Sequence, residues 1–551
     1  MDSGLRATVE AWIADDPDDR DRAELTALLE CGDRGAAAEL RERFAGRLTF
    51  GTAGLRGAVG AGPARMNRAV VRGVTAAVAG WLRAQAPGPG QARAGELSVV
   101  VGCDARHRSA EFADEVARVL AGAGIRAHVL PRPCPTPLLA FAVRHLGTRA
   151  GIMITASHNP AADNGYKLYL ADGAQVIPPA DAEIEARSAD PRPLAAIPVA
   201  PLDDPLVTWH GDEVAAAYLD QVAGPPAGAD AGAGARLEVV YTAMHGVAGA
   251  LMLRAIERAG FAAPHVVKAQ AEPDPDFPTV AFPNPEEPGA LDLAFADARA
   301  READLVLASD PDGDRLAVAV PAADGTWRQL TGDQLGALLG AYLLRTHHDG
   351  TPLVATTIVS ATLLRKVAAA HGARYKQTLT GFKWIARAGD EQPDATFVFG
   401  YEEALGYLVG QVVRDKDGIG AALAVLRMAT GAKAGGRTLL DEYAALEAAY
   451  GAHRTRPISL RIPDPPAVMR SLRARPPAAI AGHQVRATTD YLEQEATGLP
   501  ASDVLSYALD GARVVIRPSG TEPKIKAYLE AETEDVLREL TDATRALLDH
   551  A

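Results

Sequence analysis

Short apolar runs alternate with amphipathic segments along the chain. Residues 97–102 are a continuous apolar run of strand length, residues 111–123 show the apolar spacing of a helix, and residues 152–155 are a second strand-like run. The same strand pattern returns further along the chain, at 237–241, 305–308 and 354–359. Strands that alternate with helices indicate α/β domains, in which the apolar runs are buried strands.

Interruptions of this pattern divide the chain into four expected domains. A chain of 551 residues is too long for one hydrophobic core and suits three or four domains. The Gly-, Ala- and Pro-rich run at 224–235 has the composition of a flexible insertion or linker, and it precedes a new α/β unit. We expect an N-terminal α/β domain with a helical extension, two further α/β domains and a smaller C-terminal α+β domain, at 1–210, 211–324, 325–456 and 457–551.

Composition and charge are those of an ordinary globular protein, with 48% hydrophobic and 23% charged residues. The net charge of −14 argues against a nucleic-acid partner, and it means that an anionic substrate would be attracted by a local basic pocket. The three cysteines, Cys31, Cys103 and Cys134, are too few and too scattered for a disulfide framework or a zinc site. These cysteines fit a reducing cytoplasm, the N-terminus does not have a signal-peptide pattern, and no apolar run reaches about 18 residues, so we expect a cytoplasmic protein without a membrane segment.

Two polar loops that follow predicted strands carry candidate chemistry. Ser157 lies in the run TASHNP after the strand at 152–155, and three aspartates lie in the run DPDGDR after a later strand. A phosphate on Ser157 would add about −1.5 to −2 charges, and each nearby aspartate would repel it by a few kcal/mol, so a divalent cation must lie between them. Alternate residues of a turned loop point the same way, which lets three carboxylates bind one Mg²⁺: Asp310, Asp312 and Asp314.

Each motif has a plainer explanation when it is taken alone. An isolated run of alternate aspartates is more often a solvated acidic turn than a metal site, and an adjacent Ser-His pair usually has no function. An EF-hand is the main competitor for the aspartates, but its sixth position would be Arg315 instead of Gly and its twelfth Pro321 instead of Glu. The prediction of a phosphoenzyme therefore depends on the two loops occurring together.

Two further loops suit a phosphorylated sugar. The run RPSGTEPK at 517–524 follows an apolar strand and offers a guanidinium, two hydroxyls and backbone N–H groups to a phosphate. The run GYEEALGY at 400–407 follows another apolar strand and carries Glu402 and Glu403, a pair of carboxylates that suits neighbouring sugar hydroxyls. Alone, the first run would be an ordinary Pro-Ser-Gly turn and the second an acidic pair near a helix N-terminus.

Taken together, the loops resemble those of the α-D-phosphohexomutase superfamily, which includes phosphoglucomutases and phosphomannomutases. They occur in the order TASHNP, DPDGDR, GYEEALGY and RPSGTEPK, and the resemblance extends from Phe50 to Lys526. The branch of type 2 phosphoglucomutases and phosphopentomutases is the most similar, because of FGTAGLRG at 50–57, GFKW at 381–384 and EEALGY. The resemblance implies an α/β fold with three related α/β domains and a smaller C-terminal α+β domain around a central cleft.

The resemblance also implies a role for each group of residues. Ser157 would be phosphorylated in the resting enzyme, and its phosphate would complete a Mg²⁺ site with Asp310, Asp312 and Asp314. His158 and Lys167 would flank the transferring group, and Arg56 and Arg315 would contribute charge near the reacting phosphate. Lys383 would reach the sugar or its phosphate. The sugar hydroxyls and the unreactive phosphate would be bound by Glu402, Glu403, Arg517, Ser519, Gly520 and Thr521.

The implied activity is that of a phospho-sugar mutase. The phosphoserine would give its phosphoryl group to a sugar monophosphate, and the other phosphate of the resulting bisphosphate would return to Ser157 after the sugar turns around. Glucose is the default sugar, with interconversion of glucose 1-phosphate and glucose 6-phosphate and a sugar 1,6-bisphosphate as activator. Mannose and pentose phosphates stay open, as do a sugar-bisphosphate synthase, a serine-dependent phosphohydrolase and a noncatalytic sugar-phosphate-binding regulator. The expected partner is a small phospho-sugar, and no motif indicates an oligomeric state.

Overall fold

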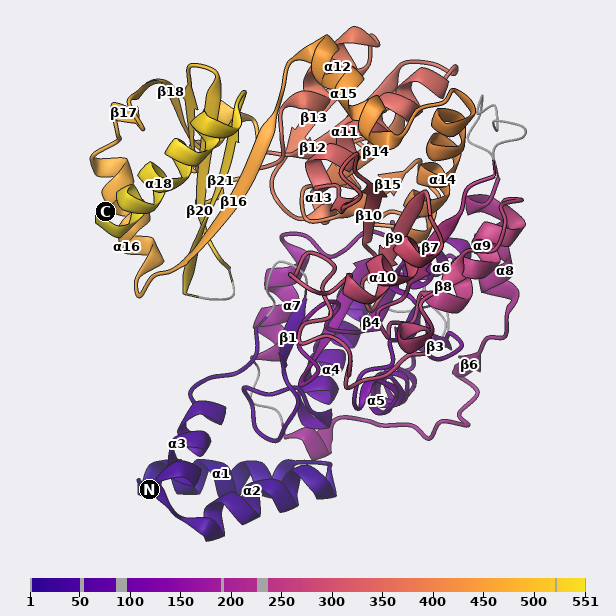
Figure 1. Cartoon of the computed structure of the whole chain (residues 1–551). Helices are drawn as coiled ribbons and strands as arrows, with labels where there is room; N and C mark the ends of the chain where they lie inside the picture. The colour runs from indigo at the N-terminus through magenta and orange to yellow at the C-terminus, as the bar shows by residue number, and fades with distance from the viewer. Residues whose placement is uncertain are drawn as a thin grey trace. The chain divides into compact units, whose positions relative to one another are not determined.

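The computed structural model of the chain describes residues 2–49, 54–85, 97–189, 193–224, 236–520 and 523–550 (Figure 1). The linker at 225–235, Thr521 and the first four residues of FGTAGLRG lie outside these ranges. The chain divides into two compact units. The first is formed by Met1–Gly224, Leu237–Val318 and Gln411–Leu423, and the second mainly by Ala319–Gly410 and Ala424–Ala551.

Three helices open the first unit. They are α1 (Ser3–Asp15), α2 (Asp19–Cys31) and α3 (Arg34–Arg43), and Figure 1 shows α1 and α2 (indigo) side by side. An aspartate side chain caps each N-terminus by accepting a hydrogen bond from a backbone N–H of the first turn: Asp2, Asp18 and Asp33. The helices share a small apolar core with the segment after them: Val9, Leu25, Leu29, Leu40 and Ala61.

A six-stranded mixed sheet follows. Its strands are β1 (Leu55–Ala58), β2 (Ser98–Cys103), β3 (Arg126–Val129), β4 (Ala150–Ile154), β5 (Asp163–Leu170) and β6 (Val207–Trp209). The helices of this region are α4 (Arg68–Gln85), α5 (Ser109–Gly122), α6 (Thr136–His145), η1 (Leu194–Ala196) and α7 (Ala180–Ser188). The strand order is β1-β5-β4-β2-β3-β6, with β2 parallel to β3 and β4, and β5 antiparallel to β4 and β1. The strands predicted at 97–102 and 152–155 and the helix predicted at 111–123 are confirmed by β2, β4 and α5.

The second sheet of the chain has five strands in the order β11-β10-β9-β7-β8. These are β7 (Val239–Thr242), β8 (His265–Val266), β9 (Leu305–Ser309), β10 (Leu316–Pro321) and β11 (Trp327–Gln329). The helices of this part are α8 (Glu213–Val222), α9 (Gly249–Arg258), η2 (Lys268–Gln270) and α10 (Asp292–Ala300). Because β7 and β9 are parallel neighbours and fully buried, the apolar runs at 237–241 and 305–308 are confirmed as core strands.

The third sheet lies in the second unit and has the order β13-β12-β14-β15. Its strands are β12 (Pro352–Thr357), β13 (Arg374–Thr378), β14 (Thr396–Glu402) and β15 (Gly406–Val409). Along the chain, α11 (Gly332–Thr346) comes before these strands, α12 (Leu363–Ala370) and α13 (Phe382–Ile385) come between them, and α14 (Gly418–Ala434) and α15 (Leu439–Tyr450) come after them. The strand predicted at 354–359 overlaps β12, which is parallel to both β13 and β14.

The C-terminal sheet is antiparallel, in the order β16-β21-β20-β19-β18-β17. Its strands are β16 (Arg454–Arg461), β17 (Ala479–Ile480), β18 (His483–Asp490), β19 (Leu505–Leu509), β20 (Ala512–Pro518) and β21 (Lys524–Ala531). Its helices are α16 (Pro465–Ala474), α17 (Gln494–Thr497) and α18 (Glu534–His550). In Figure 1, α18 (yellow) lies against this sheet, and its Leu537 and Leu540 belong to the same buried apolar cluster as Val514 and Ile516 of β20.

Three sheets with helices and a C-terminal α+β part are the α/β architecture that the sequence predicts. The predicted domain boundaries at 210, 324 and 456 stay predictions. Within the described ranges, every helix is too short or too polar to span a bilayer.

Candidate active site

Ser157 lies just after β4, in a loop that brings it to the aspartates after β9 in the same unit. It is buried, with 1% of its surface exposed. Ser157 Oγ donates a hydrogen bond to Asp310 Oδ2 at 2.8 Å, and it lies 3.2 Å from His158 Nδ1. The fold therefore joins a serine and an aspartate that are 153 residues apart in the chain.

The three aspartates form one buried cluster of carboxylates. One oxygen of each lies within 4.8 Å of the others. Gly313 turns the chain between them with φ +73°, and a Cβ at this position would lie only 2.7 Å from Ala248 Cβ. Among the described residues, Asp312 Oδ1 and Asp314 Oδ1 have no hydrogen-bond partner. Buried carboxylate oxygens without hydrogen-bond partners suit a divalent cation with a preference for oxygen, so the cluster fits Mg²⁺.

Two lysines lie against this cluster. Lys167 Nζ donates to Asp312 Oδ2 at 2.6 Å and to Asp314 Oδ2 at 2.9 Å, and Lys416 Nζ lies 3.3 Å from Asp314 Oδ2. Burial acts to lower the pKa of Lys167, but the two carboxylates outweigh it and hold that pKa above its ordinary value. Burial, followed by the charges of Asp312 and Asp314, raises the pKa of Asp310 well above its ordinary value. The negative charge at Asp310 is therefore not fully compensated by the protein, and a bound cation would supply the compensation.

Arg56, Arg315 and His158 border the same cluster. Arg56 Nη1 donates to Asn159 Oδ1 at 3.4 Å, and the backbone N–H of Arg315 donates to Asp310 Oδ1 at 3.0 Å. Burial, then the positive charges of Arg315 and Arg56, hold the pKa of His158 well below its ordinary value. The imidazole is therefore uncharged at neutral pH.

Three further residues contact this cluster although the sequence did not single them out. Thr136 Oγ1 donates to Asp312 Oδ2 at 2.6 Å, Lys416 lies at Asp314, and Arg106 donates to the carbonyl oxygen of Ser157. The only sequence signal for Lys416 is the run of charges at 414–417, directly before the apolar helix α14. Thr136 and Arg106 carry no such signal, because their contacts join segments far apart in the chain.

In the second unit, Glu402 ends β14 and Glu403 begins the turn after it. Glu403 Oε2 accepts hydrogen bonds from Ser360 Oγ at 3.2 Å and from Thr357 Oγ1 at 3.3 Å. Gly332 lies directly against this turn, because a Cβ there would lie 1.9 Å from the carbonyl oxygen of Glu403. Burial, then the negative charge of Glu402, raise the pKa of Glu403 from 4.5 to about 7.

This raised pKa predicts a pH-dependent stability. Folding favours the protonated form of Glu403, so its contribution is fully present below pH 4.5 and is lost as the pH rises through about 7. Glu403→Gln mimics the protonated form. We expect its free energy of unfolding to match that of wild type near pH 4 and to exceed it near pH 8, by at most about 3 kcal/mol, with a correspondingly higher melting temperature. Thermal unfolding of both proteins across this range measures the difference. Glu493→Gln, at an exposed position, is the control, and a constant difference for Glu403→Gln would contradict the shift.

Arg517 lies near the end of β20 and within electrostatic reach of both glutamates. Arg517 Nη2 donates to the Tyr528 hydroxyl at 3.1 Å. Burial acts to lower the pKa of Arg517, but Tyr528 and the glutamates outweigh it and raise that pKa. In the turn that follows, Ser519 N donates to Lys524 O at 2.8 Å, and Gly520 is exposed. The guanidinium is therefore held as a permanent positive charge, three residues before the exposed Gly520.

The structure thus groups the predicted residues separately within each unit. In the first unit one cluster contains Arg56, Ser157, His158, Lys167, Arg315 and the three aspartates. In the second unit, Glu402, Glu403 and Arg517 interact with one another. Lys383 lies in α13, 8% exposed, with its ammonium 5.7 Å from the centre of the Trp384 ring.

Known proteins match the chain over nearly all of its length. Four domain models of phosphoglucomutase/phosphomannomutase match in order: α/β/α domain I at residues 47–193, domain II at 216–325, domain III at 331–450 and the C-terminal domain at 468–547. A protein named "probable phosphomannomutase" from Haemophilus influenzae is 41% identical over 88% of this chain and 98% of its own length.

Two other relatives carry other names. A "probable phosphoribomutase" from Schizosaccharomyces pombe is 35% identical, over 99% of this chain and 97% of its own length. A phosphoglucomutase from Staphylococcus aureus is 34% identical over 96% of each chain. The fold is similar to that of a phosphoglucomutase/phosphomannomutase family protein from Burkholderia thailandensis, with a TM-score of 0.70 at 20% identity over 91% of this chain and 97% of that chain. The chain therefore belongs to the phosphoglucomutase/phosphomannomutase family of the α-D-phosphohexomutase superfamily, and it is a phosphomutase, an enzyme of the isomerase type.

Proposed function

We propose that this phosphomutase interconverts glucose 1-phosphate and glucose 6-phosphate through a phosphorylated Ser157 and a glucose 1,6-bisphosphate intermediate. The observation that carries the proposal is the hydrogen bond of 2.8 Å from Ser157 Oγ to Asp310 Oδ2, within a buried cluster of three carboxylates. A serine hydroxyl that meets a candidate magnesium site suits phosphoryl transfer, in which catalysis depends on positioning and on stabilising charge.

In the first half-reaction, a hydroxyl oxygen of the sugar monophosphate would attack the phosphorus of phosphoserine 157. The new P–O bond forms as the bond between phosphorus and Ser157 Oγ breaks. His158 is neutral, with Nδ1 3.2 Å from Oγ, so it can take the hydroxyl proton and return it to the serine oxygen. The second half-reaction is the reverse with the other phosphate of the bisphosphate, and it restores phosphoserine.

Positive charge would stabilise the transferring phosphoryl group. Arg56, Arg315 and Lys167 are the cationic side chains of the cluster that we assign to this role. Mg²⁺ held by Asp310, Asp312 and Asp314, together with the phosphate of Ser157, would act as a Lewis acid on the phosphoryl oxygens. Lys167 and the three aspartates are buried, so their electrostatic interactions are strong, because little water is present to screen them.

The residues of the second unit would bind the rest of the substrate. We assign the unreactive phosphate to Arg517, Ser519, Gly520 and Thr521, and the sugar hydroxyls to Glu402 and Glu403, with Lys383 at the sugar or its phosphate. An arginine fork and small hydroxyl groups bind a phosphate whichever sugar carbon carries it, which the turning of the bisphosphate requires. Glu402 and Glu403 accept hydrogen bonds from hydroxyls in either orientation.

Sugars other than glucose have specific support from the names of two relatives. The name of the Haemophilus influenzae relative favours mannose phosphates, and that of the Schizosaccharomyces pombe relative favours ribose phosphates. A substrate comparison separates these candidates from glucose.

The test is an assay of three sugar 1-phosphates, of glucose, mannose and ribose, with Mg²⁺ and a trace of the matching bisphosphate. We expect the isomeric monophosphate to form, fastest from glucose 1-phosphate, without release of free phosphate. Faster turnover of mannose or ribose phosphate would reassign the sugar. Release of free phosphate would indicate a hydrolase, and stoichiometric accumulation of bisphosphate from a phosphoryl donor would indicate a synthase.

A further inference from the structure

The backbone of the Ser157 loop has an unfavourable conformation. Ser157 has a φ of +53°, in the left-handed region that residues other than glycine rarely occupy. Such a conformation costs about 1–3 kcal/mol and persists only where the surroundings hold it in place. One support is local, since the backbone N–H of Ser157 donates to Thr155 Oγ1 at 2.9 Å. The other support comes from outside the loop.

Arg106 binds four carbonyl oxygens of this loop and the residues after it. Its Nη2 donates to the carbonyl oxygens of Ser157 at 2.5 Å and Asn159 at 2.6 Å. Its Nη1 donates to those of Pro160 at 2.7 Å and Asp163 at 3.2 Å. A buried carbonyl without a donor costs about 1–3 kcal/mol, so the loop conformation depends on this guanidinium.

Arg106 is itself held firmly. It is 4% exposed, its Nε lies 3.3 Å from Asp104 Oδ2, and its guanidinium carbon lies 5.0 Å from the centre of the Phe277 ring. Asp104 is fixed in turn, because its Oδ1 accepts hydrogen bonds from Ser109 Oγ at 2.6 Å and from the backbone N–H of Arg106 at 3.0 Å. The guanidinium therefore has one orientation in a buried polar network.

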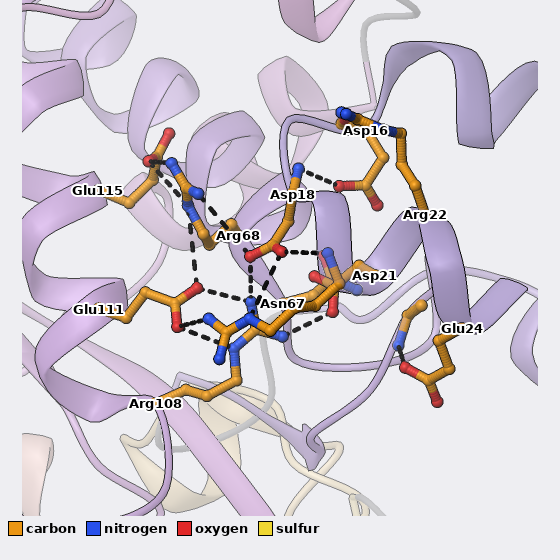
Figure 2. Close-up of polar contacts among 12 residues, drawn as sticks. Asp16, Asp18, Asp21, Arg22, Glu24, Asn67, Arg68, Arg108, Glu111 and Glu115 are labelled. Atoms are coloured by element: carbon orange, nitrogen blue, oxygen red, sulfur yellow. Dashed lines mark hydrogen bonds and ion pairs between the residues drawn. The ribbon is translucent and has the colours of Figure 1, made fainter.

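The same short segment is anchored on its other side by the N-terminal helices. Arg108, two residues after Arg106, has a φ of +62° and precedes α5. Its guanidinium donates to Asp18 Oδ2 at 2.5 Å, to Asp21 Oδ1 at 2.7 Å and to Glu111 Oε1 at 2.6 Å (Figure 2). Asp18 and Asp21 belong to the start of α2 and are 3% and 2% exposed. The contact is therefore a buried ion network between the extension and residues 104–109.

Figure 2 shows that this network is larger than one arginine. Arg68 joins Asp18 to a glutamate of α5, with Nη2 2.9 Å from Glu115 Oε2 and Nη1 3.8 Å from Asp18 Oδ2. Charges that are buried and mutually paired resist displacement, because moving one leaves its partner uncompensated. The N-terminal helices therefore hold Arg108, and with it the backbone that carries Arg106.

We propose that Arg106 is a positioning residue that holds the loop of Ser157 in its reactive conformation, and that helices α1 to α3 keep Arg106 in place through Arg108. The inference rests on the proposed phosphoryl transfer at Ser157. It assigns a role to the helices before residue 47, where the match to the first family domain begins. Arg106 does not touch the substrate in this proposal and acts only through the loop.

The test compares Arg106→Gln, Arg106→Lys and Arg108→Met with wild type. For Arg106→Gln we expect kcat to fall by about 10- to 100-fold with KM within about threefold, because misplacing a reactive group slows the transfer step more than it weakens binding. Lysine keeps the charge but not the fork of donors, so Arg106→Lys should recover part of the loss. Arg108→Met should lower kcat by a smaller factor. Hydrogen exchange of the peptide spanning 155–163 should become faster in all three variants.

Arg473→Met is the matched control. Arg473, in α16, pairs with Asp490 at the end of β18 and with Asp503 in the segment before β19, so its loss removes comparable ion pairs elsewhere. The control should lower the melting temperature and leave both kcat and the exchange of 155–163 unchanged.

Different outcomes separate this inference from the proposed function. Wild-type kcat and exchange in Arg106→Gln would overturn the positioning role, whatever the melting temperature. If Arg106→Gln shows the expected losses but Arg108→Met keeps the kcat and the exchange rate of wild type, the role of the N-terminal helices is overturned. If the wild-type protein transfers no phosphoryl group, the proposed function fails. Hydrogen exchange still tests the inference in that case, because an exchange rate at 155–163 that is the same in Arg106→Gln as in wild type would refute it.

Discussion

Replacing Ser157 with alanine is expected to reduce mutase turnover by about 10⁴-fold or more, the scale on which enzymes lose activity with their nucleophile. The proposed reaction passes through a bond between phosphorus and Ser157 Oγ, and alanine offers no oxygen for that bond. No other hydroxyl among the described residues donates to Asp310, so a neighbouring serine does not take over. Steady-state assays give the turnover, and intact mass after incubation with the sugar bisphosphate gives the phosphoryl content.

The control for this prediction is Ser459→Ala, on the exposed surface of β16. It should keep full turnover and gain the phosphoryl mass as wild type does. Ser157→Ala should still bind the sugar monophosphate, because the groups that we assign to the sugar and its unreactive phosphate lie on other residues. Turnover of Ser157→Ala within about tenfold of wild type would contradict a phosphoserine mechanism.

Replacing Asp312 with asparagine is expected to cost about 10³-fold in turnover, the second largest effect. The change removes one charge from the proposed magnesium site and leaves Lys167 with one carboxylate partner in place of two. Metal-assisted stabilisation of a phosphoryl oxygen contributes several kcal/mol, and about 4 kcal/mol corresponds to a factor of 10³ in rate. The measurement is turnover as a function of Mg²⁺ concentration, together with calorimetric titration of the metal.

We expect Asp312→Asn to need a higher Mg²⁺ concentration for half-maximal rate and to stay slower at saturation. Asp490→Asn, which removes a carboxylate bound by Arg473 in the C-terminal sheet, should leave the metal titration unchanged. Removing Mg²⁺ from wild type with a chelator should abolish turnover, and readdition should restore it. A wild-type rate that ignores the chelator would refute the assignment of the aspartates to a metal.

Much of the fold could be predicted from the sequence because its central strands are fully buried. A strand with both faces covered, such as β2 or β9, is apolar at nearly every position, and this signal is local. Short or half-exposed strands carry little of it: β8 has two residues and β6 three, and neither was predicted. Their pairing depends on neighbours that lie far away in the chain.

The candidate site also has residues that the sequence reveals and residues that only the structure reveals. Ser157 and the three aspartates stand out in the sequence because their loops follow apolar strands and because alternate carboxylates suit a cation. Arg106 and Thr136 look like ordinary loop residues there. They reach the candidate site only through hydrogen bonds to distant residues. Arg106 donates to Ser157, 51 positions away, and Thr136 donates to Asp312, 176 positions away.

The sequence by itself thus determined the α/β class, the loops that carry the candidate chemistry and the family to which they are similar, since these depend on local patterns of apolar, charged and turn residues. Only the tertiary structure decided which charges meet. It brings Lys167 and Lys416 to the aspartates, brings two hydroxyls to one carboxylate oxygen of Glu403, and joins the N-terminal helices to the Ser157 loop through Arg108 and Arg106. The physical reason is that burial and ion pairing depend on distances in space, which a chain of 551 residues specifies only when it folds.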